Sequence, residues 1–150
     1  MAPVVTSVCT SREKGTPKRS VGRVRAVAHS GLLGDAHAGT PGRQVSMLAL
    51  ESVDKMRGRG LDLAPGAFGE NINTRGIDLL ALPIGARLRV GAAVVLELTA
   101  KGKVCHDRCA IYEAVGDCVM PREGIFFEVV EGGEIAAEDE IAVLEPEGRP

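Results

Sequence analysis

Nineteen glycines interrupt this chain of 150 residues and limit what it can fold into. Closely spaced glycines break a chain into short elements, because glycine favours turns and weakens helices. The apolar runs between them are short and rich in valine and isoleucine, which favour strands. We therefore expect a mainly β fold with two or three short helices. A closed or nearly closed barrel would remove the exposed edges of so many short strands.

Most segments between the turns predict strands. The alternation of Val94, Leu96 and Leu98 is typical of a strand with one buried face. Gly91 would form the turn before that strand. Residues 125–130 fit a helix or a strand equally well. The other expected strands are residues 3–9, 21–29, a segment beginning at 68, and residues 86–90, 134–136 and 140–144.

The clearest helical pattern follows the glycine-rich loop at residues 31–42. Apolar residues recur at near-helical spacing over residues 47–56, with Ser46 as the predicted N-cap. Gly58 would end this helix. A second short helix is expected at residues 107–115.

Length and composition restrict the classes of function. We expect a single domain over residues 1–150, with its core at about 20–144 and a frayed tail at 145–150. A net charge of −2 and four aromatic residues argue against nucleic-acid binding. No apolar run reaches the roughly 20 residues that cross a bilayer. The N-terminus lacks the pattern of a signal peptide, so we expect a cytoplasmic protein without membrane contacts.

Reactive side chains are concentrated in one segment near the C-terminal third of the chain. Three of the four cysteines and one of the three histidines lie within residues 105–118, with basic residues around them. Cys105 would end a strand and precede a helix N-terminus, a position that lowers the pKa of a thiol. Such a thiolate can attack, carry sulfur or bind a metal. The alternative is a small buried hydrophobic residue, and Cys9, alone in a strand, is expected to be inert.

The same segment allows a second interpretation, which is structural zinc. Cysteine and histidine side chains are the usual ligands of such sites. The spacing provides one C-x3-C pair rather than two, so it does not match the common zinc modules. The candidate ligands are Cys105, His106, Cys109 and Cys118.

Further candidates lie outside the cysteine segment. His37 lies in the glycine-rich run Gly34-Asp35-Ala-His37-Ala-Gly39, where a ligand can approach the backbone closely, or where His37 simply bonds Asp35. Glu70 is either a polar group satisfied by backbone amides or part of a pocket wall. Basic residues that could converge on an anion, although each alone is typical of a solvated surface, are Arg43, Lys101, Lys103, Arg108 and Arg122.

Taken in order, these segments resemble the MOSC domain, the C-terminal module of molybdenum-cofactor sulfurase. The resemblance covers about residues 20–144, and the ending at residues 115–125 looks like that of the short, standalone bacterial members. The matching pieces are Val21-Gly-Arg-Val, Gly34-Asp35-Ala-His37-Ala-Gly39, Arg43-Gln44-Val-Ser46, Phe68-Gly-Glu70-Asn71-Ile, Leu82-Pro-Ile-Gly-Ala-Arg-Leu-Arg-Val-Gly91, Cys105, and Val115-Gly-Asp-Cys118-Val-Met-Pro121-Arg122-Glu-Gly-Ile.

The resemblance implies a MOSC-like β-barrel with one functional cysteine in its pocket. Cys105 matches that cysteine, which ligates the molybdenum of the cofactor molybdopterin or carries sulfur as a persulfide. Larger relatives have Gln-Pro-Arg-x-Pro-Cys where this chain has Ala100-Lys-Gly-Lys-Val-Cys105. The implied partners are a cysteine desulfurase or other sulfur donor, and molybdopterin-biosynthesis proteins or molybdoenzymes. The implied cofactor-binding residues are His37, Arg43, Glu70, Asn71, Lys103, Arg108 and Arg122.

Three functions are therefore open at this point. The first is a molybdenum-cofactor binding or sulfur-carrier protein, with a sulfurtransferase-like activity as one form of it. The second is a small interaction module stabilised by zinc. The third is a stand-alone enzyme in which Cys105 attacks a small N-hydroxylated or thiolated substrate.

Overall fold

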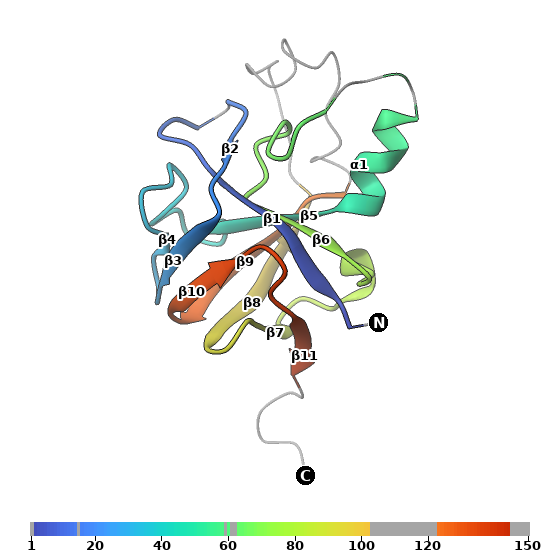
Figure 1. The fold of residues 1–150 in the computed structure, drawn as a ribbon. Coiled ribbons are helices and arrows are strands. Elements are labelled where there is room, and N and C mark those ends of the chain that lie inside the picture. The colour runs from blue at the N-terminus through green and yellow to red at the C-terminus, as the bar shows by residue number, and fades with distance from the viewer. Residues whose placement is uncertain (1, 15, 59, 61–62, 103–122, 145–150) are drawn as a thin grey trace.

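The computed structural model describes residues 2–14, 16–58, 60, 63–102 and 123–144 (Figure 1). Strands dominate this part of the chain, as the sequence predicts. The elements are β1 (Val4–Thr10), β2 (Arg19–Ser20), β3 (Arg23–Val27), β4 (Gly31–Leu32), β5 (Val45–Ala49), α1 (Leu50–Arg57), β6 (Ile72–Arg75), η1 (Leu79–Ala81), β7 (Arg87–Val90), β8 (Val94–Lys101), β9 (Ile125–Glu131), β10 (Gly133–Ala136) and β11 (Ile141–Leu144).

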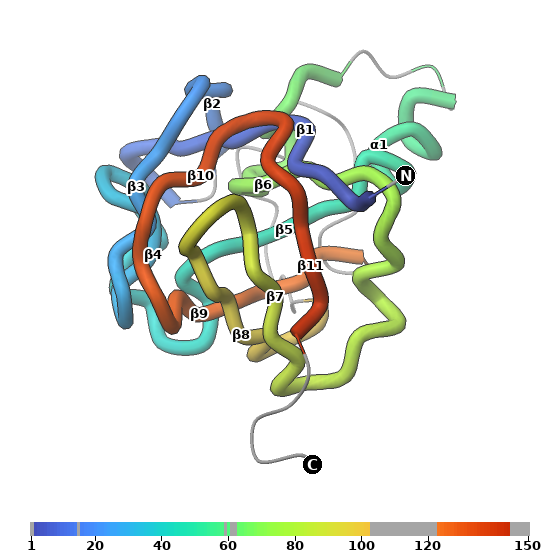
Figure 2. Tube along the Cα trace, turned by 60° about the horizontal axis from the view of Figure 1, so that its bottom comes forward, coloured from blue at the N-terminus to red at the C-terminus, as the bar shows by residue number. Residues whose placement is uncertain are grey.

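The strands form one large curved sheet and one small sheet. The large sheet has the order β11-β7-β8-β9-β5-β6-β1-β2, and β5 and β6 are its parallel pair among otherwise antiparallel neighbours. The small sheet has the order β10-β3-β4. The large sheet curls until β1 meets the residues before β11, where Val5 N–H donates to Asp139 O at 2.8 Å (Figure 2). An isolated bridge joins Val4 to Glu140 at the same place, so isolated contacts rather than a continuous ladder join the two sides.

Two apolar clusters lie on opposite faces of the large sheet. Met47 belongs to the inner cluster with Ile72 and Phe127, and all three are fully buried. Leu48, its neighbour in β5, belongs to the outer cluster with Phe126, where α1 supplies further buried side chains. Successive residues of a strand face opposite sides, so β5 is buried on both of its faces. Burial of each large side chain contributes roughly 1.5–3 kcal/mol.

The predicted start of the first helix is wrong. Ser46 lies in β5 rather than at an N-cap, and α1 begins at Leu50 after Ala49, whose side chain makes no cap hydrogen bond. A strand that is buried on both faces reads as a nearly continuous apolar run, and such a run cannot be told from a buried helix by periodicity. The predicted end is confirmed, because Gly58 N–H donates to Asp54 O at 2.9 Å.

Most of the other expected elements are confirmed. Each strand expected from the sequence contains or overlaps an observed one, and the ambiguous residues 125–130 belong to β9. Gly91 forms the predicted turn between β7 and β8, with a backbone φ of +68°. Residues 79–81 form the short 3-10 helix η1. The helix expected at residues 107–115 lies outside the described residues.

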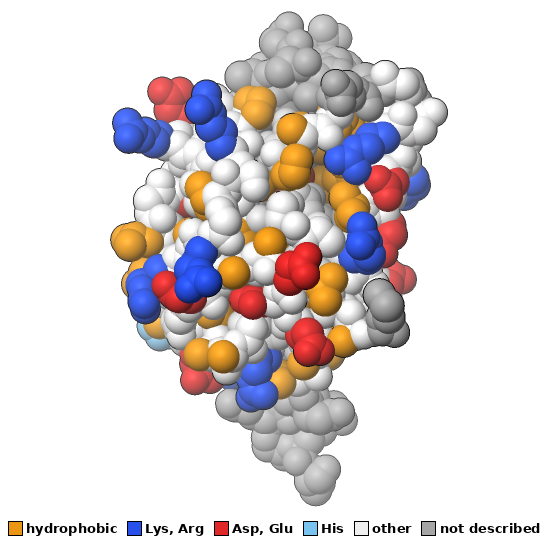
Figure 3. Space-filling view, viewed as in Figure 1, with side chains coloured by type: hydrophobic (Ala, Val, Ile, Leu, Met, Phe, Trp, Pro, Cys, Tyr) orange, Lys and Arg blue, Asp and Glu red, His pale blue; other side chains and the backbone are white. Residues whose placement is uncertain are grey.

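The described surface carries mixed charges. On the face drawn in Figure 3, acidic and basic side chains lie beside one another among the coloured residues. No helix within the described ranges is both long enough and apolar enough to cross a membrane.

Candidate functional site

The cysteine segment leaves and rejoins the sheet at one point. Gly102 follows β8 and Gly124 precedes β9, and the N–H of Gly102 donates to the carbonyl of Gly124 at 2.6 Å. The two described ends of the connection are therefore adjacent. The residues between them that were singled out from the sequence lie outside the described residues; they are Lys103, Cys105, His106, Arg108, Cys109, Cys118 and Arg122.

Four strands of the large sheet begin or finish at the same end of the sheet as this connection. Ile125, at the start of β9, lies opposite Lys101 of β8 on one side and Met47 of β5 on the other. Because β6 runs parallel to β5, the last residue of β6, Arg75, lies at the same end of the sheet as the last residue of β5. The start of α1 and the loop from Gly76 to Leu80 therefore lie beside the attachment points of the cysteine segment.

The loop between β4 and β5 carries His37 and Arg43. Consecutive turns connect them, because Thr40 N–H donates to His37 O and Arg43 N–H donates to Thr40 O. The exposed guanidinium of Arg43 lies 5.2 Å from the centre of the Phe126 ring in β9, a cation–π contact. Thr99 of β8 also donates its hydroxyl to the carbonyl of Gly42, so the loop is fixed against β8 and β9.

A buried ion pair holds the other end of this loop. The ammonium of Lys18 lies 2.8 Å from Asp35 Oδ1, and both side chains are 0% exposed. Backbone N–H groups of Ser11 and His37 also donate to the Asp35 carboxylate, each at 3.1 Å. Burial alone would raise the pKa of Asp35, but Lys18 and these two amides together hold it below its ordinary value.

Lys18 also determines the tautomer of His37. The three protons of its ammonium meet three acceptors, which are Asp35 Oδ1, Ser11 Oγ at 3.1 Å and His37 Nδ1 at 3.1 Å. An ammonium has no lone pair, so Nδ1 of His37 must accept. The neutral imidazole therefore carries its proton on Nε2. His37 is partly exposed, at 25% of its side chain, and is the acceptor end of a buried polar cluster.

Lys18 was not singled out from the sequence. A lysine is normally exposed, and nothing in the local pattern around residue 18 distinguishes it from Lys14, which is exposed. Its backbone contributes as well, because Lys18 N–H donates to Gly66 O at 2.8 Å. A Cβ on Gly66 would overlap the carbonyl of Lys18, and Gly66 has a φ of +82°, so this contact requires glycine.

Glu70 closes the loop that meets Lys18. It is 1% exposed, and its carboxylate accepts from Gly66 N–H at 3.2 Å, Phe68 N–H at 3.0 Å and Asn73 Nδ2 at 2.8 Å. Burial raises its pKa, and these donors oppose the shift. Backbone amides therefore satisfy the carboxylate of Glu70, which is one of the two interpretations given from the sequence. Glu70 also lines a small cavity of about 250 Å³ between α1 and the sheet.

Asn71 joins three segments of the chain. Its Oδ1 accepts from the backbone N–H of Ser46 at 2.9 Å, and its Nδ2 donates to Cys9 O at 3.0 Å. The side chain is fully buried. Glu70 and Asn71 thus shape the loop at residues 64–71, while direct contact of either residue with a cofactor stays a prediction.

Cys9 is the free cysteine within the described residues. It is fully buried, and burial raises the pKa of its thiol to about 12. Thiolates react and thiols do not, so this environment agrees with the expectation that Cys9 is inert. The described ranges contain no group of three or more histidine, cysteine or acidic side chains that could hold a metal ion.

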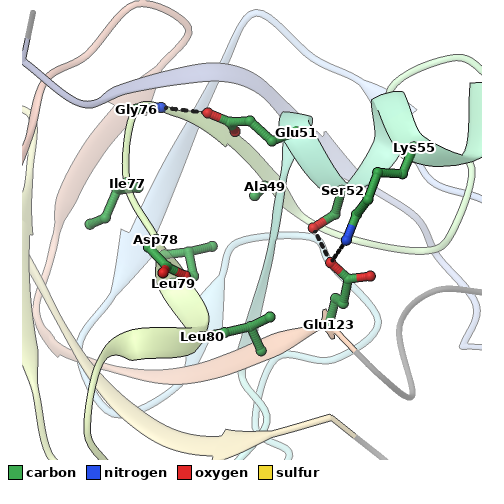
Figure 4. A pocket seen from close by; sticks show the side chains of 10 residues that line it. All are labelled: Ala49, Glu51, Ser52, Lys55, Gly76, Ile77, Asp78, Leu79, Leu80 and Glu123. Carbon is green, nitrogen blue, oxygen red and sulfur yellow. Dashed lines mark hydrogen bonds and ion pairs between the residues drawn. The ribbon is translucent and has the colours of Figure 1, made fainter.

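A cavity of about 580 Å³ lies beside the attachment point of the cysteine segment (Figure 4). One wall is the start of α1 and the opposite wall is the loop that follows β6. Glu123, the first described residue after the cysteine segment, closes one side by accepting from Ser52 Oγ and Lys55 Nζ, each at 2.7 Å. The lining residues are Ala49, Glu51, Ser52, Lys55, Gly76, Ile77, Asp78, Leu79, Leu80 and Glu123.

The curled sheet, its parallel β5–β6 pair and the ordered polar loops match one class of protein. Residues 34–142 match the family model described as the MOSC domain. The chain belongs to the MOSC domain family. This agrees with the resemblance noted from the residue pattern, although that pattern extends to residue 20 on the N-terminal side.

Solved structures with the same fold come from several bacteria. The YUAD protein from Bacillus subtilis has a TM-score of 0.76 and 18% sequence identity, with 94% of each chain covered. YiiM from Escherichia coli has a TM-score of 0.70 and 20% identity, covering 97% of this chain and 71% of that one. YiiM from Geobacillus stearothermophilus has a TM-score of 0.72 and 18% identity, covering 95% and 75%. These identities establish the fold alone, and no functionally curated protein matches the sequence.

Proposed function

We propose that this protein binds a molybdenum–pterin cofactor or carries sulfur for its assembly, with Cys105 as the ligand or carrier. In the binding form, the thiolate of Cys105 would ligate the metal. In the carrier form, it would attack the terminal sulfur of a donor persulfide, and the donor thiolate would leave. The donor would be a cysteine desulfurase, and the acceptor a molybdopterin-biosynthesis protein or a molybdoenzyme.

Membership of the MOSC domain family is the observation that carries this proposal. The matched residues, 34–142, include Cys105 and other candidate site residues, among them His37, Arg43, Glu70 and Asn71. The adjacency of Gly102 and Gly124 supports it further, because the segment that holds Cys105 is attached where β8, β9 and the end of β5 meet. The loop carrying His37 and Arg43 is fixed to the same two strands, β8 and β9.

The described residues fit the phosphate of such a cofactor at one point. Arg43 is exposed and forms no ion pair with another described residue, so its guanidinium is available to an anion. Lys18 is not available, because all three of its donors are used inside the protein. When bound, the cofactor would supply a metal centre that a cysteine thiolate can ligate.

The test is a mass spectrum of the intact protein under native conditions, isolated without reductant, with the modified residue mapped by fragmentation. The same measurement follows incubation with a cysteine desulfurase and cysteine. We expect one extra sulfur on Cys105, or the mass of a bound pterin cofactor. Cys9 is the internal control, since its buried thiol should carry nothing.

Matched variants complete the test. Cys105→Ser should lose sulfur loading and cofactor binding, while Cys109→Ser and Cys118→Ser should retain at least one of them. Loading that persists in Cys105→Ser would contradict the proposal. A zinc increment that disappears on unfolding would instead favour the zinc-stabilised module, and a protein that takes up neither sulfur nor cofactor would also contradict the proposal.

A further inference from the structure

We propose that the 580 Å³ cavity beside α1 binds a small primary ammonium ion that carries an apolar group. This "α1 cavity" is the space lined by the start of α1, the loop at residues 76–80 and Glu123 (Figure 4). Its volume lies in the range of about 300–1,000 Å³ that is typical of small-molecule sites. The inference is independent of Cys105 and of the cofactor.

The walls of the α1 cavity provide the apolar part of the site. Ala49 forms the inner wall at the end of β5, and Leu79 and Leu80 lie on the opposite loop, which also contributes Ile77 to the lining (Figure 4). Leu80 is 42% exposed, which leaves a large apolar side chain at the rim without cover from the described residues. An aromatic or aliphatic group of a ligand would remove this surface from water.

The charges of the α1 cavity favour a cation. Three carboxylates and one ammonium line it. The ammonium, that of Lys55, is 2.7 Å from the carboxylate of Glu123 and is therefore already neutralised. The two other carboxylates, Glu51 and Asp78, have no cationic partner among the described residues.

The two unneutralised carboxylates lie on opposite walls. Glu51 projects from α1 and accepts from Gly76 N–H at 3.0 Å, which holds its carboxylate toward the loop (Figure 4). Asp78 is exposed on that loop, and its carboxylate makes no cap hydrogen bond to η1. Lys101 lies at the edge of this region, but its ammonium donates to Leu80 O at 2.8 Å and does not line the cavity.

The two carboxylates without a cationic partner also disfavour the binding of phosphate or another anion in the α1 cavity. An anion would meet two uncompensated carboxylates, while the single lining cation is occupied. A neutral ligand would gain the apolar walls but not the charge interaction. The expected order of affinity is therefore ammonium, then the neutral analogue, then the carboxylate analogue.

The experiment is a titration of the full chain, labelled with ¹⁵N, with three probes of similar shape. These are 2-phenylethylamine, 2-phenylethanol and 3-phenylpropionate. We expect the amine to bind with a dissociation constant on the order of 1–10 mM, as its nine heavy atoms would allow. The shifted amides should be those of Ile77, Leu79 and Leu80, and the propionate should cause no saturable shift.

Two charge-neutral variants identify the groups responsible. Asp78→Asn and Glu51→Gln should each weaken amine binding about 3- to 5-fold, the range expected for a partly exposed ion pair. Glu131→Gln, an exposed acid at the far end of β9, should leave it unchanged. Equal binding of phenylethanol and the amine, or shifts elsewhere on the protein, would overturn the inference. Cys105→Ser should bind the amine normally, so this result is separate from the test of cofactor binding.

Discussion

The buried pair between Lys18 and Asp35 provides the sharpest test of the structure. Asp35→Asn keeps the shape of the side chain and removes its charge. The ammonium of Lys18 would remain among Ser11 Oγ and His37 Nδ1, at the same depth, without a counter-ion. An uncompensated buried charge is among the most destabilising changes that a single substitution makes.

The size of the effect follows from the contacts. Removing one partner of a fully buried pair costs about 3–5 kcal/mol. The new amide also cannot accept on its nitrogen, so either Ser11 N–H or His37 N–H loses its acceptor, which costs about 1–3 kcal/mol where the group stays buried. These two terms overlap, so we expect the free energy of unfolding to fall by about 3–5 kcal/mol. For a chain of this length the melting temperature should fall by roughly 6–20 °C.

The assay is urea unfolding at neutral pH, with thermal unfolding as a second probe. The matched control is Glu134→Gln, which breaks the exposed pair with Arg23 and should cost less than about 1 kcal/mol. The double variant Lys18→Met/Asp35→Asn removes both charges and should be more stable than Asp35→Asn alone. A loss below about 1 kcal/mol in Asp35→Asn, or a double variant that is less stable than both single ones, would refute the argument.

Four further predictions rest on the same network. Lys18→Met should shift the His37 tautomer toward protonated Nδ1 in ¹⁵N NMR spectra, whereas an unchanged tautomer would refute the assignment. Because the pKa of Asp35 is lowered, its contribution to stability should be full above its unfolded value of 3.8 and lost as pH falls further; acid unfolding of Asp35→Asn should lack this part of the pH dependence. Burial raises the pKa of Cys9 from 9.0 to about 12, so the unfolded chain loses this proton first and the free energy of unfolding should fall as pH rises above 9.0. At pH 8 the thiol of native Cys9 should not be alkylated. Gly66→Ala should destabilise the fold by more than 1 kcal/mol in urea unfolding, since a φ of +82° and the overlap with a backbone carbonyl both oppose a Cβ.

The sequence predicts the strands of the fold better than their junctions. Alternation in β8 is readable because one face of that strand packs inside the curled sheet. β5 is not readable in the same way, because Leu48 and Met47 are both fully buried and nothing marks where the strand becomes α1. The role of Ser46, bonded to Asn71 across the β5–β6 pair, depends on a residue 25 positions away. Local pattern carries no information on such a partner.

The candidate site divides in the same manner. The sequence singles out His37 and Glu70 because each is a polar residue near glycines, and the resemblance adds Asn71; their part in binding stays a prediction. Lys18, which connects their loops, was not identifiable, because only tertiary contacts with Asp35 and Gly66 distinguish it from a surface lysine. The resemblance supplied the role of Cys105, which lies outside the described residues.

These contacts separate the residues that hold the site from those that would perform its chemistry. Asp35 and Glu70 use their carboxylates to fix backbone amides, and Asn71 joins β5 to β1. Their replacement should therefore reduce the free energy of unfolding first, with any loss of function in proportion to the unfolded fraction. Cys105→Ser should show the opposite, a complete loss of loading at unchanged stability. If Glu70→Gln instead abolished loading at full stability, Glu70 would contact the ligand directly, in addition to accepting the hydrogen bonds of the backbone amides.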